Sequence, residues 1–93
     1  MKLICDPAKD SENQRKHGVS LSEATGMDWD DALLWQDTRR DYGEKRMVAL
    51  GVIGNRLYCA VYVDRGSDRR IISLRKANQR EFDHYAQETN QTE

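Results

Sequence analysis

The sequence predicts an α+β fold, in which a small antiparallel sheet of three to four strands, in meander order, follows two helices and precedes a third. Two observations carry this prediction. Between residues 45 and 75, three runs rich in aliphatic and β-branched residues are separated by short glycine-containing turns, a pattern typical of strands joined as hairpins. Outside this stretch, helix-capping residues precede three further segments. A single sheet cannot bury its own apolar face, so helices must cover it.

Length and composition favour one small domain. The chain has 93 residues, so we expect a single domain over residues 1–93 with a frayed tail at residues 90–93. Apolar residues make up 38% and the net charge is −1, which allows a fold with a small core. No run approaches the ~18 apolar residues that span a bilayer. The first residues lack the apolar stretch of a signal peptide, so we expect a cytoplasmic protein.

The first predicted elements are a strand and a helix. Residues 2–5 form a short apolar run, which predicts a strand. Asp6 and Pro7 follow as a helix N-cap and a first-turn proline, so we expect a helix over residues 8–17. Gly18 comes next, and glycine is the residue type that most often ends a helix with a positive φ.

A second helix and a candidate strand are predicted before a polar loop. Ser20 and Glu23 have the spacing of a capping box, which predicts a short helix over residues 21–27. Residues 32–35 are apolar and are a candidate strand. Residues 37–44 are polar and include a glycine, so we expect a loop there.

The clearest local signal is a hairpin. Residues 45–53 and 56–64 have the composition of strands, and Gly54 and Asn55 between them favour a tight two-residue turn. Such a turn pairs residues whose numbers sum to 109. A slip by one residue would exchange the two faces of one strand, so the register is well specified.

A third strand over residues 69–75 completes the meander, and pairing Asp64 with Arg69 sorts the side chains onto two faces. We expect helices to cover the face that carries the larger aliphatic residues: Arg46, Val48, Leu50, Val52, Leu57, Cys59, Val61, Val63, Arg70, Ile72 and Leu74. The other face is expected to be open and has small residues between tyrosines and arginines: Met47, Ala49, Gly51, Ile53, Arg56, Tyr58, Ala60, Tyr62, Ile71, Ser73 and Arg75.

A last helix is predicted near the C-terminus. Asn78 is a capping residue, and Glu81 occupies the capping-box position three residues later. Phe82, Tyr85 and Ala86 have helical spacing and form the apolar stripe of this helix.

Charge is segregated along the chain, although the net charge is small. Residues 1–37 carry 4 basic and 8 acidic side chains, whereas residues 38–80 carry 11 basic and 4 acidic ones. Residues 81–93 carry 4 acidic side chains and no basic one. A basic centre between acidic ends favours a local site for a polyanion. The alternative is a solvated, salt-bridged surface.

The face expected to be open is the candidate RNA surface. Tyr58 and Tyr62 are candidates for stacking on unpaired bases, which contributes about 1–3 kcal/mol per base. Arg75 is a candidate for binding phosphate through its planar guanidinium. This combination suits single-stranded RNA better than a duplex groove. The alternative is that these are ordinary cross-strand residues of a half-exposed sheet.

Cleavage of RNA requires a group that deprotonates a 2′-hydroxyl, cations that stabilise the pentavalent phosphate, and a proton donor. The candidates for proton transfer are Lys16, His17, Glu44 and Lys76, and those for charge stabilisation are Arg46, Arg70 and Arg75. The cysteines, Cys5 and Cys59, are too few for a disulfide framework, and no group of residues has the spacing of metal ligands. We therefore expect no metal and no cofactor.

Four segments of the chain, in order, resemble the BrnT family. They are residues 6–9 (Asp-Pro-Ala-Lys), residues 16–20 (Lys-His-Gly-Val-Ser) with Glu23 and Ala24, residues 42–46 (Tyr-Gly-Glu-Lys-Arg), and residues 70–77 (Arg-Ile-Ile-Ser-Leu-Arg-Lys-Ala) with Glu81 and Tyr85. The resemblance covers about residues 4–85. It implies a single RelE-like domain, a type II toxin with a ribonuclease fold in which a bent antiparallel sheet carries the RNA site.

The resemblance also implies a partner and a set of site residues. The partner is a cognate BrnA-type antitoxin, which binds DNA, neutralises the toxin in a hetero-oligomer and represses the shared operon. The residues carried over by motif are Lys16, His17, Glu44, Arg46, Arg70, Arg75 and Lys76.

Each of these residues has an expected role. Arg75 and Arg46 are expected to stabilise phosphate charge. Alternation puts Arg46 on the face expected to be covered, but at the start of a strand. From there its side chain either reaches around the sheet edge or pairs with Glu44. Alternation puts Arg70 on the same face as Arg46, and Arg70 is expected to bind RNA. The remaining roles are RNA binding for Lys16, proton transfer for His17 and phosphate binding for Lys76.

Two function classes remain open on the sequence. The first is metal-independent RNA cleavage that inhibits translation. The alternative is a non-catalytic protein-binding module that pairs with a DNA-binding antitoxin and acts in operon autorepression. Direct DNA binding is disfavoured, because no helix-turn-helix motif is present and the helical segments are acidic or of mixed charge.

Overall fold

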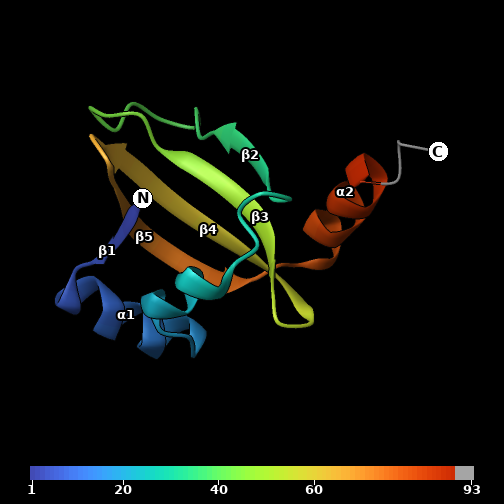
Figure 1. The fold of residues 1–93 in the computed structure, drawn as a ribbon, viewed down its shortest axis with the longest axis horizontal. Coiled ribbons are helices and arrows are strands. Elements are labelled where there is room, and N and C mark those ends of the chain that lie inside the picture. Colours follow the sequence, from blue (N-terminus) through green and yellow to red (C-terminus); the bar gives the residue numbers. More distant parts are fainter. Residues whose placement is uncertain (90–93) are drawn as a thin grey trace.

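The computed structural model describes residues 1–89, so the expected frayed tail at residues 90–93 lies outside the described residues. Figure 1 shows a twisted sheet with two helical segments against one face and a third helix beyond one end. The elements in chain order are β1 (Lys2–Cys5), α1 (Pro7–His17), the 3-10 helix η1 (Leu21–Gly26), β2 (Leu33–Gln36), β3 (Met47–Ile53), β4 (Arg56–Arg65), β5 (Asp68–Lys76) and α2 (Gln79–Thr89).

The predicted α+β class is confirmed, but the predicted sheet is wrong in two respects. The sheet has five strands rather than three to four, in the order β1-β5-β4-β3-β2. It is mixed rather than antiparallel, because β1 pairs in parallel with β5. Both outer strands coincide with short apolar runs that the sequence marked as strands. The edge that a four-residue strand joins depends on tertiary contacts, which local pattern does not encode.

The N-terminal elements form as predicted. Asp6 caps α1, because its carboxylate accepts a hydrogen bond from the backbone N–H of Lys9 (3.1 Å). Gly18 ends this helix in the left-handed region, with a φ of 71°. The second predicted helix is the 3-10 helix η1, and its first N–H, from Leu21, donates to the Asp10 carboxylate (2.8 Å).

The register of the central hairpin is confirmed, whereas that of the next hairpin is only partly correct. In β3 and β4, Val48 pairs with Val61, as the predicted turn requires. In β4 and β5, Asp64 pairs with Arg69 as predicted, but a β-bulge then shifts the register so that Val61 pairs with Ser73. One additional residue of β5 is thereby accommodated without a partner on β4.

The bulge changes the face on which the second half of β5 lies. Arg75 pairs with Cys59 and Leu74 pairs with Ala60, whereas the sequence predicted the opposite arrangement. Ser73 and Arg75 therefore lie on the aliphatic face of the sheet, and Leu74 lies on the face with the small residues. A β-bulge leaves no clear mark in a pattern of alternating residues, which is why alternation alone missed it.

The helices cover the face that was expected to be open, so the prediction of which face is free is wrong. The buried cluster on the covered face joins η1 to the sheet and consists of Leu21, Ala24, Met27, Ala49, Ala60, Tyr62, Ile71 and Leu74. The physical reason is visible at Gly51, where an added Cβ would lie 2.7 Å from Met27 Sδ. The small residues of this face give space to η1 rather than to a ligand.

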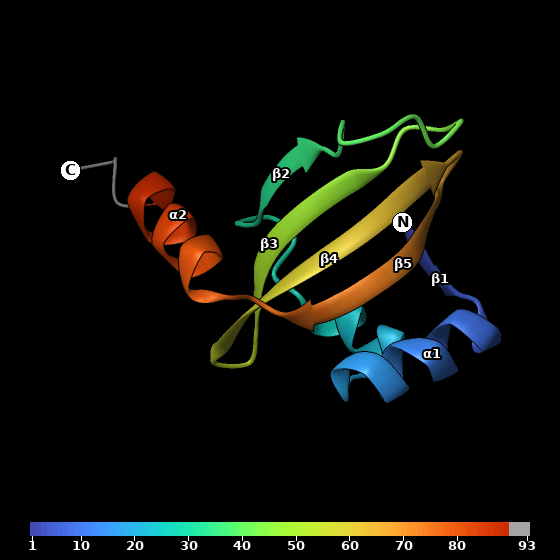
Figure 2. The same ribbon diagram turned by 180° about the vertical axis from the view of Figure 1, so that it is seen from behind.

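On the side of the opposite face, seen in Figure 2, α2 lies beyond one end of the sheet. A second buried cluster lies on this side and consists of Val48, Leu50, Leu57 and Cys59. Tyr85 from α2 packs partly against that cluster, but no residue of α2 is buried. The larger aliphatic residues therefore form a second, smaller core, and the side chains of Arg46, Arg70 and Arg75 on this face stay partly exposed. Within residues 1–89, no helix is long and apolar enough to cross a membrane.

One buried amide ties α1 to the sheet. Asn13 is 4% exposed and donates to the carbonyl oxygens of Val19 (2.9 Å) and Leu74 (2.8 Å). Its amide oxygen also accepts from the backbone N–H of Leu74 (3.1 Å). This stretch of β5 lies beyond the residues that pair with β1. The side chain of Asn13 therefore takes the place of a neighbouring strand at this position.

We expect Asn13→Asp to destabilise the protein by about 1–3 kcal/mol, because the buried carbonyl of Leu74 and the partly buried carbonyl of Val19 lose their donor and face a carboxylate. Asn55→Asp is the matched control, since Asn55 is exposed in the central turn, and it should change the free energy of unfolding little. Urea unfolding followed by circular dichroism measures both variants. Equal stability of the two variants would show that the Asn13 contacts do not anchor α1.

Candidate functional site

Arginine side chains gather on the sheet face opposite α1 and η1, which we call the arginine face. It comprises the outward positions of β3, β4 and β5 that share the side of Cys59 and Val63. On β4, Val63 pairs with Arg70 of β5. The β3–β4 pairing begins at Met47 and Tyr62, and its extension by one residue places Arg46 opposite Val63 on the side away from Arg70. Two strand spacings separate Arg46 from Arg70, or about 10 Å between backbones. Both long side chains can therefore reach one anion above Val63.

A carboxylate, that of Glu44, lies among the arginines at this end of the face. Glu44, in the loop before β3, accepts a hydrogen bond from Arg65 Nη2 (2.7 Å). This hydrogen bond lowers the pKa of Glu44, and the positive charges of Arg65, Arg46 and Arg70 lower it further. Of the two alternatives for Arg46, the ion pair with Glu44 does not form, because Arg65 is the partner of Glu44.

The arginines differ in whether a carboxylate neutralises them. Three on or beside this face are paired: Arg39 with Asp37, Arg65 with Glu44, and Arg75 with Glu81. Among residues 1–89, Arg46 and Arg70 form no ion pair. The Nε of Arg46 is buried without a hydrogen-bond partner, and its guanidinium lies 4.2 Å from the ring centre of Tyr42. Arg46 and Arg70 therefore offer unneutralised charge to an anion.

Arg75 lies at the other end of the face, where it holds the start of α2. Its guanidinium donates two hydrogen bonds to the Glu81 carboxylate (2.8 and 2.7 Å). The predicted capping box is confirmed, since Asn78 and Glu81 exchange side-chain-to-backbone hydrogen bonds (2.9 and 2.8 Å). The hydrogen bond from Arg75 lowers the pKa of Glu81. A groove of about 320 Å³ extends from this pair to Asp37 and Arg39.

Lys16 and His17 lie elsewhere. Both are exposed at the end of α1, where they line a groove of about 220 Å³ together with Ser73 of β5. Lys16 Nζ lies 3.6 Å from a carboxylate oxygen of Glu12. The groove lies between α1 and the edge of β5, and the arginine face lies beyond that edge. The structure thus does not bring Lys16 and His17 into contact with Glu44, Arg46 or Arg70.

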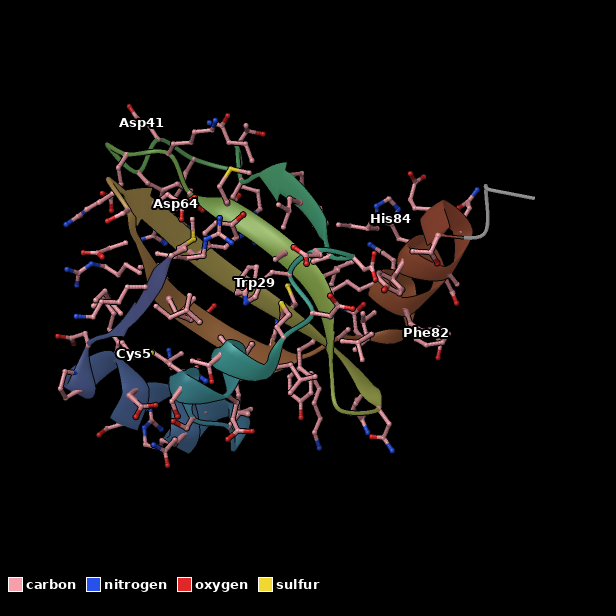
Figure 3. All side chains as sticks on the ribbon, viewed as in Figure 1. Cys5, Trp29, Asp41, Asp64, Phe82 and His84 are labelled. Carbon is pink, nitrogen blue, oxygen red and sulfur yellow. The ribbon has the colours of Figure 1, made fainter. Side chains whose placement is uncertain are left out.

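The predicted surface of Tyr58, Tyr62 and Arg75 is wrong. Tyr62 is 1% exposed beneath the N-terminal segments, and its ring meets that of Trp29 edge-on at 5.4 Å. Tyr58 is half-buried against the same cluster. Figure 3 shows Trp29 in front of the sheet, on the covered side. The bulge puts Arg75 on the opposite face, so no single surface presents all three side chains.

The remaining predicted residue, Lys76, is exposed at the end of β5 and pairs with Tyr58 across the strands. The sequence interpretation missed Asp37, Tyr42 and Arg65, which complete the site. Tyr42 was present in the motif that carries Glu44, but a loop has no alternation from which to place its side chains. Arg65 is the last residue of β4 and lies two residues after Val63, so alternation along the strand places both side chains on the same face.

Neither a metal cluster nor a reactive thiol stands out at the site. Within residues 1–89, no group of three His, Cys, Asp or Glu side chains converges as metal ligands. Both cysteines are free, and burial raises the pKa of the Cys59 thiol to about 11. A thiol with that pKa is protonated at neutral pH and is a poor nucleophile. The charged side chains described on this face are arginines and carboxylates.

Comparison with known protein families gives a match. A family model described as the ribonuclease toxin BrnT of type II toxin-antitoxin systems matches residues 5–81. The matched range runs from the end of β1 to the first turn of α2 and includes every residue placed on the arginine face. No curated protein matches the chain.

We expect Glu81→Gln to loosen α2, because this helix buries no residue of its own and the Arg75–Glu81 pair is its main polar anchor. Amide hydrogen exchange in α2 should accelerate roughly tenfold, the effect of losing one charge-assisted hydrogen bond, while exchange in β3 and β4 stays unchanged. The pair lowers the pKa of Glu81 below its usual value of 4.5. Wild-type α2 should therefore loosen only when the pH falls below that value.

Asp83→Asn is the control for this measurement, since Asp83 accepts a hydrogen bond from Gln79 on the exposed side of the same helix. Unchanged exchange in Glu81→Gln would show that the ring contacts of α2, made by Tyr85 and by His84 against Trp35, suffice to hold the helix.

Proposed function

Because the chain belongs to the BrnT family of ribonuclease toxins of type II toxin–antitoxin systems, we propose that the arginine face is the surface on which it cleaves RNA. One observation carries this assignment. Arg46 and Arg70, which are both partly exposed, flank the buried Val63, they have no carboxylate partner within residues 1–89, and Glu44 lies close enough for both charges to lower its pKa. This arrangement provides cations for a phosphate beside a group that accepts a proton.

Arg46 and Arg70 bind the scissile phosphate in this proposal. A guanidinium presents a planar fork of N–H donors that matches two phosphate oxygens and stays charged at all relevant pH values. Charge accumulates on the non-bridging oxygens as the pentavalent phosphate forms, so cations already in place stabilise that state more than the ground state. The guanidinium groups supply this charge without a bound metal ion, which makes the proposed cleavage metal-independent.

Glu44 accepts the proton of the attacking 2′-hydroxyl. Of the four candidates for proton transfer, only Glu44 contributes to the arginine face; Lys16 and His17 lie beside α1, and Lys76 pairs with Tyr58. The lowered pKa of Glu44 keeps it ionised at neutral pH, and an ionised carboxylate is the form that accepts a proton. The 2′ oxygen then bonds to phosphorus, and the departing 5′ oxygen takes a proton from the solvent that reaches this open face.

The other predicted residues take flanking roles in this proposal. Lys16 and His17 contact RNA that continues over the edge of β5 into the groove beside α1. Lys76 contacts the backbone near the end of β5. Such contacts lengthen the bound segment and add affinity through phosphate charge rather than chemistry.

A type II system implies a protein antitoxin, and we propose that it is a DNA-binding protein of the BrnA type. An acidic or amphipathic segment of this antitoxin would neutralise the toxin by covering the arginine face, and the complex would repress its own operon. RNA as the target places the activity of the free toxin in the cytoplasm. The RelE-like relationship remains a prediction.

We expect Arg46→Gln and Arg70→Gln each to reduce RNA cleavage by about 100-fold, which is the cost of removing one donor to a developing oxyanion. Arg56→Gln is the matched control, because Arg56 is exposed on the other side of the sheet, and it should cleave normally. Cleavage of a defined RNA oligonucleotide in EDTA measures all three variants. Full activity of both site variants, or an absolute need for a divalent cation, would refute the proposed centre.

Arg75 has either a chemical role or a structural one, and paired variants separate the two. If its guanidinium contacts RNA, Arg75→Ala should lose cleavage, whereas Glu81→Ala, which frees that guanidinium, should keep or raise it. If Arg75 only anchors α2, both variants should lose activity equally. Growth arrest on induction, with cleavage by the purified proteins, gives the readout. We expect the first outcome.

A further inference from the structure

The loop between β2 and β3 is organised around a buried carboxylate that the sequence did not single out. The side chain of Asp37 is 2% exposed. It accepts hydrogen bonds from the backbone N–H of Arg39 (3.2 Å), from its Nε (2.9 Å) and from its Nη2 (2.8 Å). A fourth comes from the hydroxyl of Tyr42 (3.1 Å). These donors, led by the Arg39 side chain, hold the pKa of Asp37 well below its usual range.

The same carboxylate and tyrosine lead directly to Arg46. The backbone N–H of Asp37 donates to the carbonyl oxygen of Arg46 (2.8 Å), which extends the β2–β3 ladder by one residue. The ring of Tyr42 lies 4.2 Å from the Arg46 guanidinium carbon, the geometry of a cation–π contact. Both the backbone and the side chain of Arg46 are therefore fixed by this loop.

The way in which Arg46 is held differs from that of the other arginines. Arg39 and Arg75 are held by carboxylates, which occupy their donors and cancel their charge. Tyr42 holds Arg46 through its ring, which restricts the side chain but leaves the N–H groups at the guanidinium end for another acceptor. An aromatic contact is thus compatible with phosphate binding, whereas an ion pair would compete with it.

Asp37 also fixes the orientation of that ring. A tyrosine in a loop has free rotation about two side-chain bonds, and the hydrogen bond from its hydroxyl to a buried, immobile carboxylate removes this freedom. Because Arg39 neutralises Asp37, the carboxylate does not itself attract Arg46. The chain of contacts runs from the buried Asp37 through Tyr42 to Arg46.

We propose that Asp37 and Tyr42 are positioning residues for Arg46: the carboxylate fixes the tyrosine hydroxyl, and the ring holds the guanidinium toward the scissile phosphate. This inference rests on the proposed function, in which Arg46 contacts that phosphate. Neither residue touches RNA. Their effect is to keep Arg46 ready for the transition state, where small errors in placement have large effects on rate.

The test combines graded substitutions with a double-mutant cycle on the full chain. Tyr42→Leu removes the ring and should lower kcat for a defined RNA oligonucleotide about tenfold, with KM little changed. Tyr42→Phe keeps the ring, loses only the hydroxyl, and should lower kcat only a few-fold. Asp37→Asn keeps the shape of the side chain and should resemble Tyr42→Phe, provided that its melting temperature shows a folded protein.

The cycle separates positioning from a general effect on structure. In an Arg46→Gln background, Tyr42→Leu should cause no further loss, because the residue that it positions is gone. A second readout does not depend on activity: the Arg46 Nε–H proton should show an upfield NMR shift from the Tyr42 ring that Tyr42→Leu abolishes.

Two results would overturn the inference in distinguishable ways. If Arg46→Gln cleaves RNA normally, the proposed function fails and the positioning role fails with it. If Arg46→Gln is impaired but Tyr42→Leu is either fully active or equally damaging in both backgrounds, the phosphate assignment stands and the positioning role is wrong.

Discussion

The bulge in β5 is the constraint on which the arrangement of this molecule depends. Without it, strict alternation would carry Arg75 beneath η1 and turn Leu74 toward solvent. With one additional residue in β5, Ile71 and Leu74 both reach the core under the N-terminal segments, while Arg70 and Arg75 both face the opposite side. Bulges increase local twist and redirect side chains, often next to functional sites. Here one bulge supplies both a complete core and a continuous arginine face.

The second constraint is the closeness with which η1 approaches the sheet. The sheet has two faces of nearly equal apolar content, so hydrophobicity alone does not determine which one is covered. The approach at Gly51 decides it, since Met27, the residue directly after η1, lies 2.7 Å from the position that a Cβ at residue 51 would occupy. The other face has branched side chains, which extend further from the sheet, and α2 packs against it only in part. The N-terminal segments therefore pack against the face that allows the closest approach, and the arginine face is the one that they leave uncovered.

These two constraints show how far the sequence could predict the structure. Caps, turns and short apolar runs are local, so Asp6, Gly18 and the turn at Gly54 placed the helix and the hairpin correctly. The choice of covered face and the register beyond the bulge are tertiary properties, and alternation inverted both. Of the candidate site residues carried by the family resemblance, Glu44, Arg46 and Arg70 lie together, whereas Lys16 and His17 lie beside α1. Tyr62, which was chosen because of its predicted face, is buried.

The segregation of charge along the chain acquires a structural meaning in the fold. The basic central segment supplies the arginines, and the acidic flanks supply the residues that neutralise the outer ones: Asp37, the last residue of the first flank, pairs with Arg39, and Glu81, the first of the second, pairs with Arg75. The centre between them is held by a tyrosine ring instead of a carboxylate. A chain of almost zero net charge thus concentrates unneutralised cations at Arg46 and Arg70, where a phosphate can displace water without displacing an ion pair.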